Sequence, residues 1–166
     1  VNSEKLNFIL EATKSYKHNG KDFFDHLFRT SGIVEKLCQK IGIEDSEYLI
    51  DAALFHSIYG TDYYEFNKQI SREKIISLIG EKAEKLVHFF CGLTDRNIQI
   101  LQHKFEPSLQ RDLYILEYAN LIELSVADVQ KTSALNPSKI FRLKLLRANL
   151  IDHYKFDMPP LPFSFA

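Results

Sequence analysis

Two histidines lie in apolar stretches with helical spacing, His26 in FFDHLFRT and His56 in AALFHSIYGT. A buried imidazole costs free energy unless its ring nitrogens find partners, so two inward-facing histidines indicate a shared polar site. Imidazole titrates near neutral pH and also binds divalent zinc, iron or nickel. We therefore expect His26 and His56 to act as metal ligands or as a general acid and base. For each histidine alone, a structural hydrogen bond in the core explains the pattern equally well.

Helical spacing places a third polar residue with them. A helix advances about 100° per residue, so positions three, four and seven apart share a face. His26 lies at the edge of one apolar stripe, His56 faces the core, and Asn120 lies on the apolar face of a later helix. A buried amide can also bridge two helices for structural reasons. Together, however, the three residues predict one pocket between their helices.

A glycine turn follows His56 directly, in the segment Ser57-Ile58-Tyr59-Gly60-Thr61. Glycine adopts positive φ readily and would let the backbone and Thr61 approach a ligand. We expect Arg29 and Arg96 to orient an anionic group, although an exposed arginine after a capping aspartate also explains Arg96. The residues expected to hydrogen-bond a ligand are Ser57, Tyr59, Gly60, Thr61 and Asn120.

These motifs resemble the HD-domain superfamily, whose helical members bind one or two metals through histidines and aspartates. The segments that carry the resemblance are DHL at 25–27, AALFHS at 52–57 and EYANLIEL at 117–124. The stretch FHSIYGT further resembles a divergent HD-like family with a His-Ser-x-Tyr-Gly-Thr signature. The similarity covers about residues 18–125.

The resemblance implies an enzyme acting on a small molecule, because superfamily members include nucleotide phosphohydrolases and di-iron oxygenases. Both aspartates of the pattern are replaced here, by Ser57 and Asn120. Carboxylates neutralise and bridge divalent cations, so we expect no di-metal centre and at most one divalent ion, held by His26 and His56. The expected activity is hydrolase-like or oxygenase-like. The alternative is a degenerate HD-like domain that binds a small ligand or a protein partner without turnover.

Composition excludes other classes. The 166 residues are 45% hydrophobic, which favours one domain over 1–166 with an extended tail at 155–166. A nucleic-acid binder usually carries a strongly positive surface, whereas the net charge here is −1. No apolar run is long enough to cross a membrane. Two cysteines in apolar surroundings predict buried free thiols and a cytoplasmic protein. The expected partner is a small molecule, with an anion favoured; the oligomeric state stays open.

The periodicity that must position the site is helical nearly throughout. Helix starts are predicted at Asp22, Asp45, Ser71 and Pro107, and helix ends at Asn19-Gly20 and Gly42. The fold class is therefore all-α, as a single HD-like helical bundle. The expected helices cover about 3–17, 23–41, 46–56, 71–79, 81–91, 97–105, 107–126 and 137–153.

Overall fold

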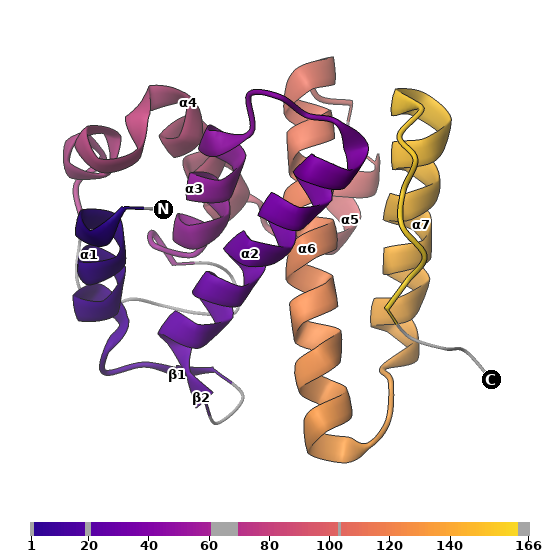
Figure 1. The fold of residues 1–166 in the computed structure, drawn as a ribbon, viewed down its shortest axis with the longest axis horizontal. Coiled ribbons are helices and arrows are strands. Elements are labelled where there is room, and N and C mark those ends of the chain that lie inside the picture. The colour runs from indigo at the N-terminus through magenta and orange to yellow at the C-terminus, as the bar shows by residue number, and fades with distance from the viewer. Residues whose placement is uncertain (1, 19–20, 61–69, 103, 163–166) are drawn as a thin grey trace.

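The computed structural model describes residues 2–18, 21–60, 70–102 and 104–162. Within these ranges the chain forms seven helices and one short antiparallel ribbon, so the fold is all-α as predicted (Figure 1). The elements are α1 Ser3–Thr13, β1 Lys17–His18, β2 Lys21–Asp22, α2 Phe23–Ile41, α3 Glu47–Phe55, α4 Arg72–Gly92, α5 Arg96–Gln102, α6 Pro107–Thr132 and α7 Pro137–Tyr154.

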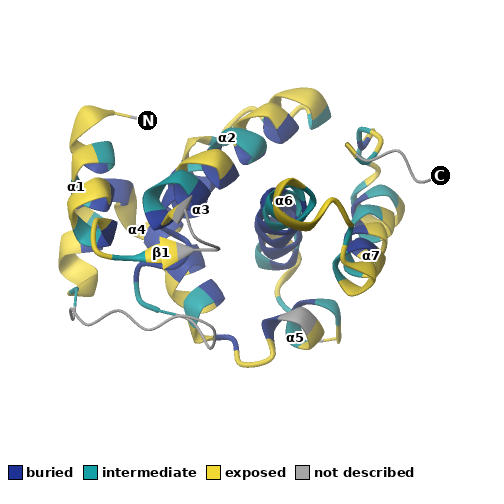
Figure 2. Ribbon diagram, turned by 90° about the horizontal axis from the view of Figure 1, so that it is seen from below, coloured by how far each residue is buried: buried dark blue, intermediate teal, exposed yellow. Residues whose placement is uncertain are grey.

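Two buried helices organise the bundle. The short helix α3 is apolar around most of its circumference, and nearly all of its residues are buried between α2 and α4. The long helix α6 is buried over residues 112–121, with α2 on one side and α7 on the other (Figure 2). A helix that is apolar all round requires such cover on every side. The core therefore lies where α2, α3 and α6 meet.

Local capping rules explain several helix ends. Helix α2 begins after Asp22 and ends at Gly42, whose φ of 76° is left-handed and whose N–H donates to the Cys38 carbonyl. The side chains of Ser71 and Asn136 accept hydrogen bonds from backbone N–H groups in the first turns of α4 and α7. The two helices predicted at 71–79 and 81–91 form α4, interrupted by the non-helical Gly80.

Four boundaries differ from the sequence predictions, and one of them is the end of α5, which lies at Gln102 rather than near 105. The first helix ends at Thr13 rather than near 17, because the chain then pairs β1 with β2, with Lys17 opposite Asp22. Asn19-Gly20 falls between these strands in sequence and lies outside the described residues. The third helix has Ser46, not Asp45, at its N-cap. Helix α6 continues past 126 to Thr132, where Ser133 takes a left-handed conformation.

None of the described helices combines the length and the apolar composition needed to cross a bilayer.

Candidate functional site

The two histidines meet where α2 packs on α3. The Nε2 atoms of His26 and His56 lie 3.2 Å apart, although the residues are 30 positions apart in the sequence. Their rings are arranged edge to face, with centroids 5.1 Å apart, and both side chains are buried. The structure therefore brings together two of the three residues that the sequence places in one pocket.

Each imidazole is held by its other nitrogen. His26 Nδ1 lies 2.6 Å from Oε2 of Glu123 on α6. His56 Nδ1 lies 2.6 Å from the carbonyl oxygen of Ala53, one turn earlier on α3. A carbonyl oxygen can only accept, so His56 Nδ1 carries a hydrogen and donates it. These contacts fix both rings with their Nε2 atoms facing each other.

The hydrogens of this chain of contacts can be counted. Because His56 donates through Nδ1, its Nε2 in the neutral ring is an acceptor, and His26 Nε2 must donate to it. The contact between His26 Nδ1 and Glu123 requires one more hydrogen. With a neutral His56, the pair of His26 and Glu123 holds two hydrogens and has no net charge, as an imidazolium with a carboxylate or as two neutral groups. A cation between the Nε2 atoms could take the place of the hydrogen there.

Glu123 was missed by the sequence analysis, although helical spacing could have revealed it. Glu117, Asn120 and Glu123 recur every third residue on α6 and so share one face. Asn120 is buried as expected, but its amide nitrogen donates to Glu117 Oε2 at 3.1 Å. The carboxylate at His26 therefore comes one turn later than the position that the HD resemblance assigns.

Arg96 belongs to a second buried cluster around Glu117. Its Nε lies 3.3 Å from Glu117 Oε2, and Arg142 of α7 donates to the other carboxylate oxygen at 3.1 Å. The Arg96 guanidinium also lies 4.2 Å from the centroid of the Phe90 ring, which contacts the His56 ring edge to face. Arg96 is thus one aromatic ring away from the histidine pair and shares the Glu117 carboxylate with Arg142.

The turn after His56 is anchored to α4. Gly60 has a φ of 83° and donates to the carbonyl of Ser57, which is itself buried. The Tyr59 hydroxyl donates to Glu84 at 2.9 Å, and Arg72 binds the same carboxylate through two nitrogens. Arg72 holds the pKa of Glu84 below its ordinary value. The Tyr59 hydroxyl therefore fastens the turn, while Thr61 lies outside the described residues.

Arg29 lies away from the histidines' Nε2 atoms, on the exposed side of α2. It lines a cleft of about 570 Å³ to which α1, α2, α3 and α6 all contribute. Glu123 also lines this cleft, so one carboxylate reaches both the cleft and His26. This cleft is not the pocket that the sequence predicts, because its walls include neither histidine nor Asn120, and Glu123 is its link to the pair.

Metal binding would depend on the imidazoles. Across the part of the chain that the structure describes, no group of three or more histidine, cysteine, aspartate or glutamate side chains could hold an ion. The two Nε2 atoms are the nitrogen ligands that this site offers.

The comparisons with known proteins identify a family. The family described as a domain of unknown function (DUF6817) matches residues 9–96, which is more than half of the chain, and the chain belongs to it. No curated protein and no solved structure matches the chain. The matched segment contains both histidines, the turn and Arg96, whereas Glu123 and Asn120 come from α6 outside it.

Proposed function

We propose that this member of the DUF6817 family is an HD-like enzyme for a small molecule, with the imidazole pair of His26 and His56 as its reactive group. The observation that carries the proposal is the pair's geometry. The Nε2 atoms face each other at 3.2 Å, and both Nδ1 atoms are held by acceptors. Two buried imidazoles fixed in this way are unusual as a purely structural device, because one ring with two partners satisfies the core equally well.

The chain's own residues support proton transfer. Glu123 orients His26 and balances a positive charge on its ring, and the Ala53 carbonyl selects the tautomer of His56 that accepts at Nε2. A hydrogen can then be held between the rings or passed to a group that binds there. General acid and base groups act in this way when their partners fix their orientation.

The pair also fits one divalent metal ion. Two nitrogens bound to one zinc ion at about 2.0–2.1 Å with a tetrahedral angle lie about 3.3–3.4 Å apart. The 3.2 Å between the Nε2 atoms is close to this spacing. Metal-binding histidines usually donate their other N–H to a carboxylate or a backbone carbonyl, the roles that Glu123 and Ala53 fill here. When bound, such an ion supplies a Lewis acid that polarises a substrate oxygen or acidifies a water.

We expect no second ion. Among the residues that the structure describes, Glu123 contacts the pair at His26 Nδ1, on the side away from the facing nitrogens. Ser57 and Asn120 are neutral, so two cations about 4 Å apart would repel with little negative charge between them. We therefore propose a site with at most one ion.

Metal titration tests the proposal. Protein purified without chelators should contain or take up no more than one zinc, nickel or iron(II) ion per chain, measured by elemental analysis. His56→Ala should abolish that binding, and Ser57→Asp should strengthen it by adding a carboxylate. The control is His153→Ala, which removes an exposed histidine from the last turn of α7. Two tightly bound ions per chain would overturn the single-ion site.

Catalysis needs a separate assay. Hydrolysis of p-nitrophenyl phosphate and p-nitrophenyl acetate, with and without added metal, should be lost in both His26→Ala and His56→Ala but retained in His153→Ala. Activity that survives both substitutions would refute the imidazole pair as the reactive group.

A binding domain without turnover is the second candidate. It is favoured by the burial of the pair, because only 6% of His26 and 1% of His56 is exposed. Ligand binding that is unchanged by His56→Ala, together with no turnover of any substrate, would support this candidate.

A further inference from the structure

The cleft beside α2, here called the α2 cleft, has the size and walls of a small-molecule site. Its volume of about 570 Å³ lies within the usual range for ligand pockets, about 300–1,000 Å³. Its walls are mainly apolar, and Phe28 is 48% exposed. The apolar residues that matter here are Phe28, Ile33, Ile50 and Val126.

A glycine keeps one wall of the cleft open. Gly32 lies in the middle of α2, where glycine is about 1 kcal/mol less favourable than alanine. A Cβ atom built at Gly32 would meet nothing within 4 Å, so no close packing requires the glycine. A larger side chain at this position would instead project into the space that Gly32 lines.

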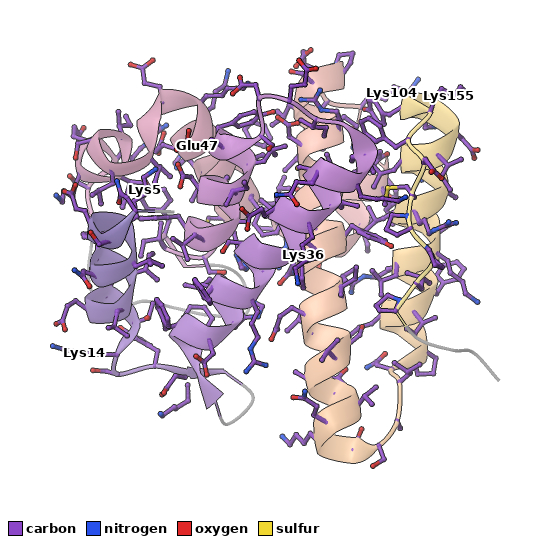
Figure 3. All side chains as sticks on the ribbon, viewed as in Figure 1. Lys5, Lys14, Lys36, Glu47, Lys104 and Lys155 are labelled. Carbon is purple, nitrogen blue, oxygen red and sulfur yellow. The ribbon has the colours of Figure 1, made fainter. Side chains whose placement is uncertain are left out.

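Charged groups surround the cleft in an asymmetric way. Arg29 and Lys36 are exposed and two helical turns apart on α2, so they share a face. In Figure 3 the labelled Lys36 lies where α2 passes α6. Glu35 is the exposed acidic residue there, which leaves the rim with one excess positive charge. The buried Glu123 is engaged by His26.

We propose that the α2 cleft binds a small amphipathic organic anion. Its apolar body would lie against Phe28, Ile33 and Val126, and its acidic head would lie at the rim beside Arg29 and Lys36. This inference does not depend on the proposed reaction, since it concerns binding alone. It gives that reaction a substrate class, because Glu123 connects the cleft to His26 through a 2.6 Å contact.

Three probes with the same apolar chain separate the contributions: octanoate, octylammonium and octanol. Nitrogen-edited NMR titrations should show octanoate shifting the amides of α2 and the ring nitrogens of His26. A favourable charge contact at an exposed rim is worth up to about 1 kcal/mol, so octanoate should bind about fivefold more tightly than octanol. Octylammonium should bind more weakly than either. Equal binding of all three probes would overturn the anion assignment, and no octanoate binding would overturn the site.

Gly32→Leu tests the location without threatening the fold. Leucine favours helix over glycine, so the variant should melt at the same or a higher temperature. Its side chain should fill the cleft and weaken octanoate at least about tenfold. Gly92→Leu is the matched control, because a Cβ at Gly92 also meets nothing within 4 Å and Gly92 lies on α4 away from the cleft. Undiminished binding to Gly32→Leu would overturn the location.

Two further variants complete the test. Arg29→Gln with Lys36→Gln should erase the preference for octanoate over octanol, and a retained preference would contradict the role of these cations. His56→Ala should leave octanoate binding intact while abolishing metal binding. Failure of the cleft can therefore be told apart from failure of the imidazole centre.

Discussion

Replacing Glu123 with glutamine tests whether the histidine pair holds the hydrogens that its contacts require. Glutamine keeps the shape of the side chain and an oxygen that can accept from His26 Nδ1, but it removes the negative charge and any carboxyl hydrogen. Its amide N–H can donate to His26 Nδ1, so a neutral His26 can keep the hydrogen between the Nε2 atoms, and what the variant loses is the charge of the Glu123 contact.

The structure sets the size of the effect. The contact between His26 and Glu123 is 2.6 Å long, and both side chains are more than nine-tenths buried. A hydrogen bond to a charged group contributes about 1.5–3 kcal/mol, and breaking a buried ion pair costs about 3–5 kcal/mol. Because the amide replaces a charged contact with a neutral hydrogen bond, we expect Glu123→Gln to lower the free energy of unfolding by about 1–2 kcal/mol. In a chain of this length that corresponds to a melting temperature roughly 2–8 °C lower.

Urea unfolding followed by far-ultraviolet circular dichroism measures the loss directly. Glu35→Gln is the control, because Glu35 is an exposed acid on α2 whose replacement should change stability by less than about 0.5 kcal/mol. Nitrogen NMR of the imidazoles should show His56 protonated at Nδ1 in both proteins. A Glu123→Gln variant as stable as Glu35→Gln would refute a charged contact between His26 and Glu123, and a His56 ring without a hydrogen at Nδ1 would refute the hydrogen count.

Three further outcomes follow from other contacts. Glu84→Gln should destabilise the protein by about 1–3 kcal/mol at neutral pH. Because Arg72 lowers the pKa of Glu84, the difference in unfolding free energy between wild type and variant should be complete above the ordinary pKa of 4.5. It should shrink as the pH falls below that value, as measured by urea unfolding at each pH. Burial raises the pKa of Cys38 to about 11 and that of Cys91 to about 12, so neither thiol should react quickly with a disulfide reagent near about pH 8 until denaturant is added. Asp51→Asn should lower the free energy of unfolding by about 2–3 kcal/mol, because it leaves the buried Lys5 of α1 without its carboxylate partner. Hydrogen-exchange protection in α1 should fall as well.

Local rules in the sequence were sufficient for most helices but not for the contacts between them. Gly42 and the pair Asn136-Pro137 mark helix boundaries through backbone conformation and capping, which depend on neighbouring residues alone. The predicted end of the first helix was wrong because the chain leaves the helix at Thr13 and forms the β1–β2 ribbon. An Asn-Gly pair between two short segments is also a hairpin signal, and it was interpreted as a helix stop. Inward-facing histidines could be recognised from spacing, whereas the partner of each Nδ1 depends on how the helices are rotated against each other.

That rotation also explains why the site extends beyond the matched family segment. Residues 9–96 supply both imidazoles and the Ala53 carbonyl that fixes one of them. The other imidazole is fixed by Glu123, and α6 packs against both α2 and α3. Without α6, His26 Nδ1 would lose its carboxylate and the apolar faces of both helices would lose their cover. The paired geometry is therefore a property of the α2, α3 and α6 assembly, in which helix packing turns two core histidines into one polar centre.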